Sequence, residues 1–162
     1  MRAAYKIFLH HNRPYKLITE AKTKRIVSEP ITDFTSKSLT RLITRLHFTL
    51  RSQSHGMKLG IAAPQVGIYK QVMIAYGKLY INPSWHGASQ SEEVIEGCYS
   101  CGGGHTQYKV KRDKYGWAKW VDAEGKEHEE KLKGIEAIVF QHELSHLQGR
   151  LISDIGTLVQ PK

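Results

Sequence analysis

The feature that most constrains this sequence is the segment HELSH at positions 142–146, because it places two histidines and a glutamate in a largely apolar helix. The surrounding pattern predicts a helix from about 134 to 148, with Gly149 positioned to end it. Histidines four positions apart lie on one face of a helix, so both imidazoles can reach one metal ion. Glu143 projects about 100° away, where it can act as the base for a metal-bound water.

The apolar residues of this helix predict that it is buried in the core. Two histidines and a glutamate in such surroundings need partners, because burying polar groups unsatisfied is costly. A metal ion would supply those partners; for the motif taken alone, a solvated helix that carries it by chance is the alternative. The residues expected to bury the helix are Ile135, Ile138, Val139, Leu144 and Leu147.

The third metal ligand is not set by this helix. The longer metalloprotease pattern fails because Ile152 occupies the position of its third histidine, and no histidine follows position 146. The ligand therefore comes from Asp154 or from upstream, where Cys98 is the preferred candidate because a thiolate binds borderline ions strongly. One cysteine and two histidines would leave a position open for water, as a catalytic site requires.

Composition places few further limits on function. The chain has 162 residues, 40% hydrophobic and 24% charged, which fits a single domain over 1–162. No apolar run approaches the roughly 20 residues of a membrane span, so we expect a soluble protein that does not enter a membrane. Two cysteines and no secretory signal favour a reducing compartment. The net charge of +9 favours either contact with a polyanion such as RNA or simple solubility.

The periodicities predict an α+β fold, with antiparallel strands packed around the central HExxH helix and an N-terminal amphipathic helix. That amphipathic helix is expected over 35–54, capped by Asp33 or Thr35 and ended by Gly56. An apolar segment at 60–67 follows it. The expected strands are 71–76, 78–82, 109–121 and 126–132.

Three segments resemble, in order and in spacing, the signature of the peptide deformylases. They are GIAAPQ at 60–65, EGCYS at 96–100 and QHELSHLQG at 141–149. Stretches at 81–83 and 110–112 are similar to the segments that lie between these motifs in the family. The resemblance covers residues 58 to 153, roughly, and chance does not explain it.

The resemblance implies removal of the N-formyl group from the initiator methionine of nascent polypeptides, with release of formate. Its metal would be held by Cys98, His142 and His146, with Fe²⁺ as the usual ion and Zn²⁺, Ni²⁺ or Co²⁺ as substitutes. Glu143 would take a proton from the metal-bound water and pass it to the departing amine. The side-chain amide of Gln65 and the backbone N–H of Tyr99 would stabilise the developing oxyanion.

The resemblance also implies a cleft for the substrate backbone and for an unbranched methionine side chain, which suits a narrow apolar slot. Glu96 and Arg112 are expected to support the cysteine strand from behind the metal ligands, an ordinary surface ion pair being the alternative. The residues expected to bind substrate are Leu59, Gly60, Ile61, Val94, Gly97 and Ile138.

This sequence departs from the family pattern at several positions. Lys58 stands where a glycine is common, Ser145 where an aspartate is usual and Tyr99 where leucine is usual. The loss of a carboxylate at Ser145 predicts altered ligand support and metal affinity with catalysis retained. The segment 101–105 differs from the pattern, and the chain is expected to lack the C-terminal helical extension that contacts the ribosome in many bacterial members.

Other hypotheses compete with this one. Cys98 and Cys101 form a C-x-x-C, which with both histidines could build a structural zinc site in a basic RNA-binding module. A thioredoxin-like pair lacks its βαβ unit, so Cys101 is expected to be a spare thiol liable to form an inhibitory disulfide. A family member that has lost activity or changed its substrate is a third hypothesis, disfavoured because all the expected metal ligands are present. His105 as an additional ligand is not favoured.

The expected partners are N-formyl-methionyl nascent peptides, with the ribosome as a further hypothesis drawn from the basic charge. We expect a monomer in the bacterial cytoplasm, in an organelle matrix or, if the source is viral, in the host cytoplasm.

Overall fold

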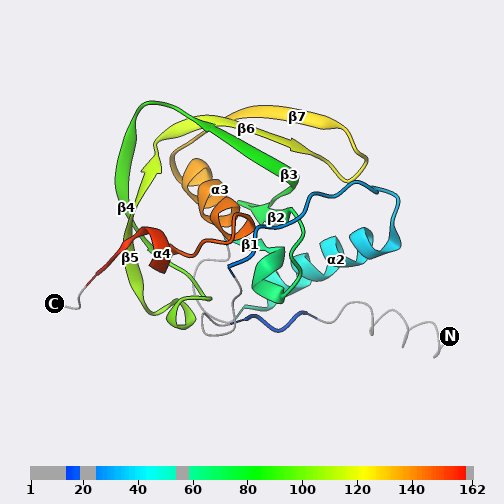
Figure 1. The fold of residues 1–162 in the computed structure, drawn as a ribbon, viewed down its shortest axis with the longest axis horizontal. Helices are drawn as coiled ribbons and strands as arrows, with labels where there is room; N and C mark the ends of the chain where they lie inside the picture. Colours follow the sequence, from blue (N-terminus) through cyan, green and yellow to red (C-terminus); the bar gives the residue numbers. More distant parts are fainter. Residues whose placement is uncertain (1–13, 19–24, 54–58, 160–162) are drawn as a thin grey trace.

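The computed structural model describes residues 14–18, 25–53 and 59–159, and the structural statements below refer to these residues. Its strands form two antiparallel sheets, one ordered β1–β2–β3–β6–β7 and the other β4–β5–β8 (Figure 1). This arrangement confirms the predicted α+β fold. The strands are β1 Gly60–Ala62, β2 Val72–Ala75, β3 Lys78–Gly87, β4 Ser91–Gly97, β5 Gln107–Asp113, β6 Tyr115–Val121, β7 Glu127–Lys133 and β8 Thr157–Leu158. The helices are α2 Lys37–Ser52, α3 Gly134–Leu147 and α4 Ile152–Ile155, with 3₁₀ turns η2 Ala63–Val66 and η3 Gly102–Gly104.

The larger sheet is covered by a helix on each face. Strand β2 is buried along its whole length, and its side chains alternate between the two faces. Met73 and Ala75 pack in the cluster that contains α3, whereas Val72 and Ile74 pack with α2. On the α3 side the core includes aromatic rings such as Tyr80, which makes edge contacts with neighbouring rings. The HExxH helix is therefore held against the inner face of this sheet.

Helix α2 is the predicted amphipathic helix, with Leu39, Leu42 and Leu46 buried. Its cap is Ser36, whose side chain accepts a hydrogen bond from the Leu39 N–H at 3.1 Å, and not Asp33 or Thr35. The carboxylate of Asp33 instead accepts from Thr35, so it is used before the helix begins. The helix ends at Ser52; Gly56, the predicted end, lies outside the described residues.

The predicted strand at 109–121 is wrong in one respect, because the segment forms β5 and β6, which belong to different sheets. The chain changes sheet at Lys114, whose N–H bonds to the carbonyl of Gln90. β1, β4 and β8 were not predicted as strands; the segment that contains β1 was described only as apolar. Strand β5 pairs with β4 and not with the larger sheet. This pairing holds β4 beside α3, so the Cys98 segment at the end of β4 lies next to the HExxH helix (Figure 1).

Candidate active site

Helix α3 and the end of β4 bring the three expected metal ligands together. One ligand atom each from Cys98, His142 and His146 lie within 4.8 Å of one another, and Cys98 Sγ is 3.3 Å from His146 Nε2. A thiolate with two imidazoles is a set that borderline divalent ions prefer, and three protein ligands leave a coordination position open. The donor set therefore fits a catalytic metal ion.

Asp154, the other candidate for the third ligand, has different partners. Its carboxylate pairs with Arg25 at 2.9 Å and accepts the Leu151 N–H at 2.7 Å at the start of α4. His105 lines the cleft beside the site, but it is not among the ligand group that the described residues form. Cys101 is likewise outside that group, which leaves the structural Cys₂His₂ hypothesis without its fourth ligand.

Glu143 lies beside the ligand group with one carboxylate oxygen unpaired. Its side chain is 4% exposed, and Oε2 is buried without a hydrogen-bond partner among the described residues. Burial raises the pKa of Glu143 to about 7, outweighing the lowering effect of the nearby His142. An unpaired buried carboxylate oxygen is costly unless a proton or a donor reaches it. The geometry thus suits a group that exchanges a proton with a water in the site.

Gly60 leaves the space that Glu143 occupies. A Cβ placed on Gly60 would lie 2.4 Å from Glu143 Oε1 and 2.7 Å from its Cγ. These separations are far below contact distance, so β1 can lie this close to the α3 carboxylate only with glycine at this position.

Gln65 is oriented by its own turn. Its Oε1 accepts the Ala62 N–H at 2.9 Å, which leaves Nε2 directed toward Ser100 Oγ at 3.4 Å and Cys98 Sγ at 3.8 Å. Pro64 is the second residue of this 3₁₀ turn, and Gly67, with φ of 81°, caps its end. The sequence therefore builds a buried amide donor that faces the metal ligands.

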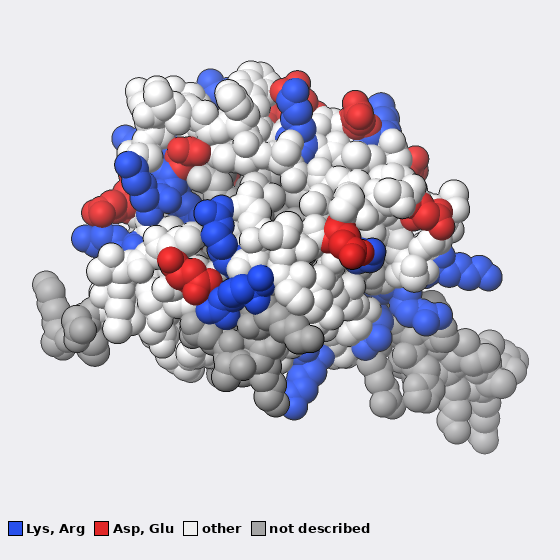
Figure 2. Space-filling view, viewed as in Figure 1, with Lys and Arg blue, Asp and Glu red and all other residues white. Residues whose placement is uncertain are grey.

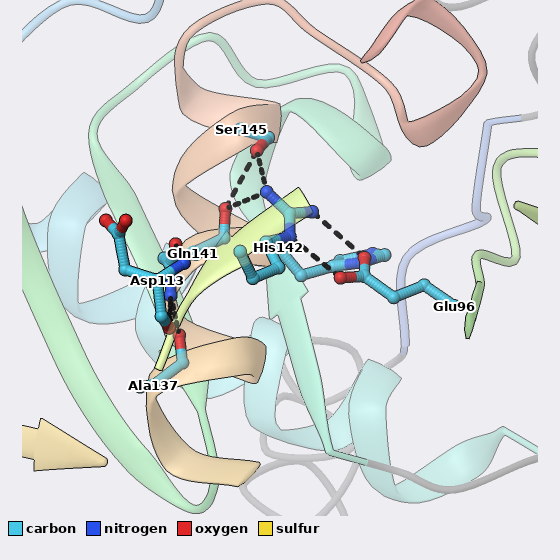
Figure 3. A network of polar contacts seen from close by, with 7 residues as sticks. Glu96, Asp113, Ala137, Gln141, His142 and Ser145 are labelled. Carbon is cyan, nitrogen blue, oxygen red and sulfur yellow. Dashed lines mark hydrogen bonds and ion pairs between the residues drawn. The ribbon is translucent and has the colours of Figure 1, made fainter. Parts of the chain in front are cut away.

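Glu96 connects a metal ligand to Arg112 (Figure 3). The carboxylate contacts His142 Nδ1 at 2.8 Å, and Arg112 donates to both of its oxygens, at 2.7 and 2.9 Å. Burial alone would raise the pKa of Glu96, but the hydrogen bonds and charges of Arg112 and His142 lower it to about 2. With Nδ1 held by an ionised carboxylate, His142 keeps Nε2 for the metal.

Two further residues extend this network: Gln141, whose contacts were not predicted, and Ser145, which stands where the family usually has an aspartate. Arg112 Nη1 donates to Ser145 Oγ at 3.0 Å, and the Ser145 hydroxyl donates to the Gln141 carbonyl at 2.8 Å. The Gln141 side chain accepts the Asp113 N–H at 2.9 Å and donates to the Asp113 carbonyl at 3.0 Å (Figure 3). Gln141 and Ser145 thus join the ligand helix to β5, behind the metal ligands.

The site opens into a cleft of about 560 Å³. Of the predicted substrate residues, all but Val94 line it, namely Leu59, Gly60, Ile61, Gly97 and Ile138. Val94 is opposite Val110 in the β4–β5 pair and is not among the residues that line the cleft, although its neighbour Ile95 is. Lys58 lies outside the described residues.

The rim of the cleft is more apolar than the sequence analysis indicated. Ile95, Tyr99 and Ile135 line it and are 59%, 45% and 45% exposed. Ile135 was expected to be buried, but it lies in the first turn of α3 and borders the cleft. Gly103 and Gly104, from the segment 101–105 that differs from the family pattern, also line the cleft.

The family model for polypeptide deformylase matches residues 17–160. This chain belongs to the peptide deformylase family. Peptide deformylases from Rhizorhabdus wittichii and Thermotoga neapolitana are 34% and 35% identical to it over 157 and 132 residues, which is 86% and 78% of this chain and 85% and 77% of the relatives.

Solved deformylases share the fold. The crystal structure of peptide deformylase from Thermotoga maritima has a TM-score of 0.80 at 30% identity, covering 92% of this chain and 99% of that one. An actinonin-bound class I type b deformylase from Acinetobacter baumannii has a TM-score of 0.79 at 26% identity, covering 88% and 98%. In this deformylase the three motifs, far apart in sequence, line one cleft.

Proposed function

We propose that this deformylase hydrolyses the N-formyl group of nascent polypeptides that begin with formylmethionine, with Glu143 as general base. The observation that carries the proposal is the buried, unpartnered Glu143 Oε2 beside Cys98, His142 and His146. Water adds to the formyl carbon and the carbon–nitrogen bond breaks, so the products are formate and a free amine. Family membership supports the reaction, and the contacts described above support the residue roles.

The metal in this proposal is Fe²⁺, with Zn²⁺, Ni²⁺ or Co²⁺ as substitutes, held by Cys98, His142 and His146. A set of one sulfur and two nitrogen ligands is compatible with each of these ions. When bound, such an ion acts as a Lewis acid that lowers the pKa of water and polarises the formyl oxygen. Glu96 and Arg112 keep the His142 ring in its binding orientation.

Glu143 moves the proton in both halves of the reaction. Oε2 accepts a proton from the attacking water and then gives it to the nitrogen of the departing amine. Burial raises the pKa of the Glu143 carboxyl above its usual range, which favours both tasks because a general base and acid works best when its pKa is near the operating pH.

Gln65 and Tyr99 stabilise charge on the formyl oxygen. The Gln65 Nε2–H and the Tyr99 backbone N–H donate hydrogen bonds as negative charge develops there. The Gln65 amide is preorganised by its bond to Ala62, so little reorganisation is needed during the reaction. The Tyr99 side chain is 45% exposed and takes no part in this step, which explains why the leucine-to-tyrosine departure is compatible with activity.

The apolar part of the cleft receives the methionine side chain. Leu59 and Ile138 line it, and an unbranched thioether fills an irregular apolar slot well. The peptide beyond methionine then passes the exposed rim formed by Ile95, Tyr99 and Ile135.

We infer that the protein works as a single-domain monomer beside the ribosome, in the cytoplasm, in an organelle matrix or, for a viral source, in the host cytoplasm. The net charge of +9 supports contact with ribosomal RNA, which is a polyanion. No helix in the described part of the chain is long and apolar enough to cross a membrane.

The test is formate release from an N-formyl-Met tripeptide by protein purified without oxygen and loaded with Fe²⁺ or Ni²⁺. Glu143→Gln should lower kcat by about 10²–10⁴-fold without loss of bound metal, because it removes only the base. Glu136→Gln, on the exposed side of the same helix, is the matched control and should leave kcat unchanged. An inactive, folded, metal-loaded wild type, or a fully active Glu143→Gln variant, would contradict the proposal.

A further inference from the structure

Cys98 and Cys101 lie opposite each other in a tight turn. They form an antiparallel bridge, and the Cys101 N–H donates to the Cys98 carbonyl at 2.9 Å. Residues opposed in this way have Cα atoms about 4.5–5.5 Å apart, within the range that a disulfide spans. The Cys101 side chain is hydrogen-bonded to that of Cys98, and the two are not joined by a disulfide.

The glycine run after Cys101 makes this turn possible. Gly102, Gly103 and Gly104 all have positive φ, between 65° and 85°, a region that favours glycine. The Gly104 N–H returns to the Cys98 carbonyl at 3.1 Å, so the chain folds back over the metal ligand. The segment thereby holds a second sulfur beside the first.

Both cysteines are buried, but only Cys98 borders the substrate cleft. Cys98 is 3% exposed and is among the residues that line the cleft, so a small oxidant approaches it from the cleft. Cys101 is 0% exposed and packs with Val110, Leu151 and Ile152 behind the ligand. A reaction with a soluble oxidant therefore begins at Cys98 and is completed by Cys101.

We propose that Cys98 and Cys101 are an oxidation site, at which peroxide closes an intramolecular disulfide that removes a metal ligand and switches the enzyme off reversibly. The effect on activity rests on the proposed role of Cys98 in binding the metal; the disulfide itself does not. No part of the proposal requires a second protein.

The chemistry balances with hydrogen peroxide as the oxidant. The Cys98 sulfur attacks one peroxide oxygen, the O–O bond breaks, and Cys98 sulfenic acid and water form. The Cys101 sulfur then attacks the Cys98 sulfur, the S–O bond breaks, and a second water leaves as the S–S bond forms. Two thiols are oxidised by two electrons in total, and one peroxide is reduced to two waters.

Two consequences follow for the site. In the disulfide, Cys98 no longer supplies a thiolate, so His142 and His146 alone do not retain the metal. The disulfide also diverts Cys98 from the sulfinic and sulfonic acids, which thiol reductants do not reverse. Oxidation that ends in the disulfide is therefore recoverable, whereas without Cys101 continued oxidation carries Cys98 past the sulfenic acid to products that thiols do not reduce.

The experiment treats the metal-loaded protein with limited hydrogen peroxide and compares wild type with Cys101→Ser. Intact mass, peptide mapping without reduction and released metal are measured, with formate release before oxidation and after reduction. The wild type should lose both thiols, show a 98–101 linkage, release its metal and regain activity after dithiothreitol and metal are added. Cys101→Ser should start equally active; as peroxide is increased stepwise, its Cys98 should gain two or three oxygens, and the protein in that state should regain no activity with dithiothreitol and metal.

A wild type that gains oxygen on Cys98 while Cys101 stays a thiol would overturn the proposal, as would linkage between chains. Cys101→Ala serves as a second variant, and thermal unfolding of each protein shows that it is folded. Because the linkage is read by mass, it is tested even if formate release is absent in every sample, an outcome that would count against the proposed function alone.

Discussion

Gly60 is the residue at which one added methyl group should most affect the reaction. The Cβ of an alanine there would overlap the Glu143 carboxylate, which is buried and has little room to move aside. Gly60→Ala should therefore displace the base and lower kcat on the order of 10²-fold, as small misplacements of a catalytic group do. Formate release measures the loss, and thermal unfolding shows whether the fold is intact.

A double-mutant cycle with Glu143→Gln tests whether Gly60 acts through Glu143. If it does, adding Gly60→Ala to Glu143→Gln should change kcat little, because the displaced group is already inactive. Two losses that multiply would show instead that Gly60 acts on the substrate or the metal independently of the base.

Residue chemistry explains which parts of the site were predictable. Cys98, His142 and His146 were predicted because few side chains bind metal, and their spacing is informative. Gln141 was not, since a glutamine in a helix has no distinctive chemistry, and its role arises only because β5 passes beside it. Val94 was misplaced for a similar reason, because sequence alone does not give the distance from a strand residue to a cleft.

The Gln141 side chain links helix α3 to strand β5 by two hydrogen bonds to the Asp113 backbone. Gln141→Leu removes its bonds to the Asp113 N–H and carbonyl and leaves these partly buried groups unpaired. The expected loss in the free energy of unfolding is about 1–3 kcal/mol, measured by urea denaturation of the metal-free protein. Gln148→Leu, the same change at an exposed position on the end of the same helix, should stay within about 0.5 kcal/mol of wild type.

Metal affinity gives a second measurement of the same contact between Gln141 and β5. Because Arg112 bridges Glu96 to the Gln141 carbonyl, loosening α3 from β5 should also shift His142, and competition with a chelator should show weaker metal binding in Gln141→Leu. If Gln141→Leu lowers the free energy of unfolding but leaves metal affinity unchanged, the contact between Gln141 and β5 stabilises the fold without positioning His142.

Helices and strands were predicted well where local sequence signals agreed with one another. They were predicted poorly where pairing with a distant strand determines the structure. Helix α3 has its periodicity and Gly149 after it, and it was predicted within one residue. The division of 109–121 into two strands was missed because Lys114 is neither glycine nor proline, and the break comes from a bond to Gln90. Strand β4 carries Glu92 and Glu93, which disfavour strands, and it forms because all seven of its residues pair with β5.

For the whole molecule, the positive charge is concentrated in one part of the chain. Residues 1–91 contain 14 Lys and Arg against three Asp and Glu, whereas residues 92–162 contain 10 against 12. Figure 2 shows Lys and Arg along the α2 edge, at the lower right, without Asp or Glu beside them among the described residues drawn there. A polyanion such as ribosomal RNA would therefore meet the α2 edge in preference to the β6–β7 hairpin.

This asymmetry makes the proposed ribosome contact testable by charge reversal. Lys37→Glu, in the exposed first turn of α2, should weaken binding to purified ribosomes and flatten its dependence on salt, because a phosphate contact is lost. The added acid at a helix N-terminus does not endanger the fold. Lys126→Glu, equally exposed in the hairpin, is the matched control and should bind like wild type. Equal weakening by both variants would point to a net-charge effect without a preferred face, and binding that ignores salt would exclude an electrostatic contact with RNA.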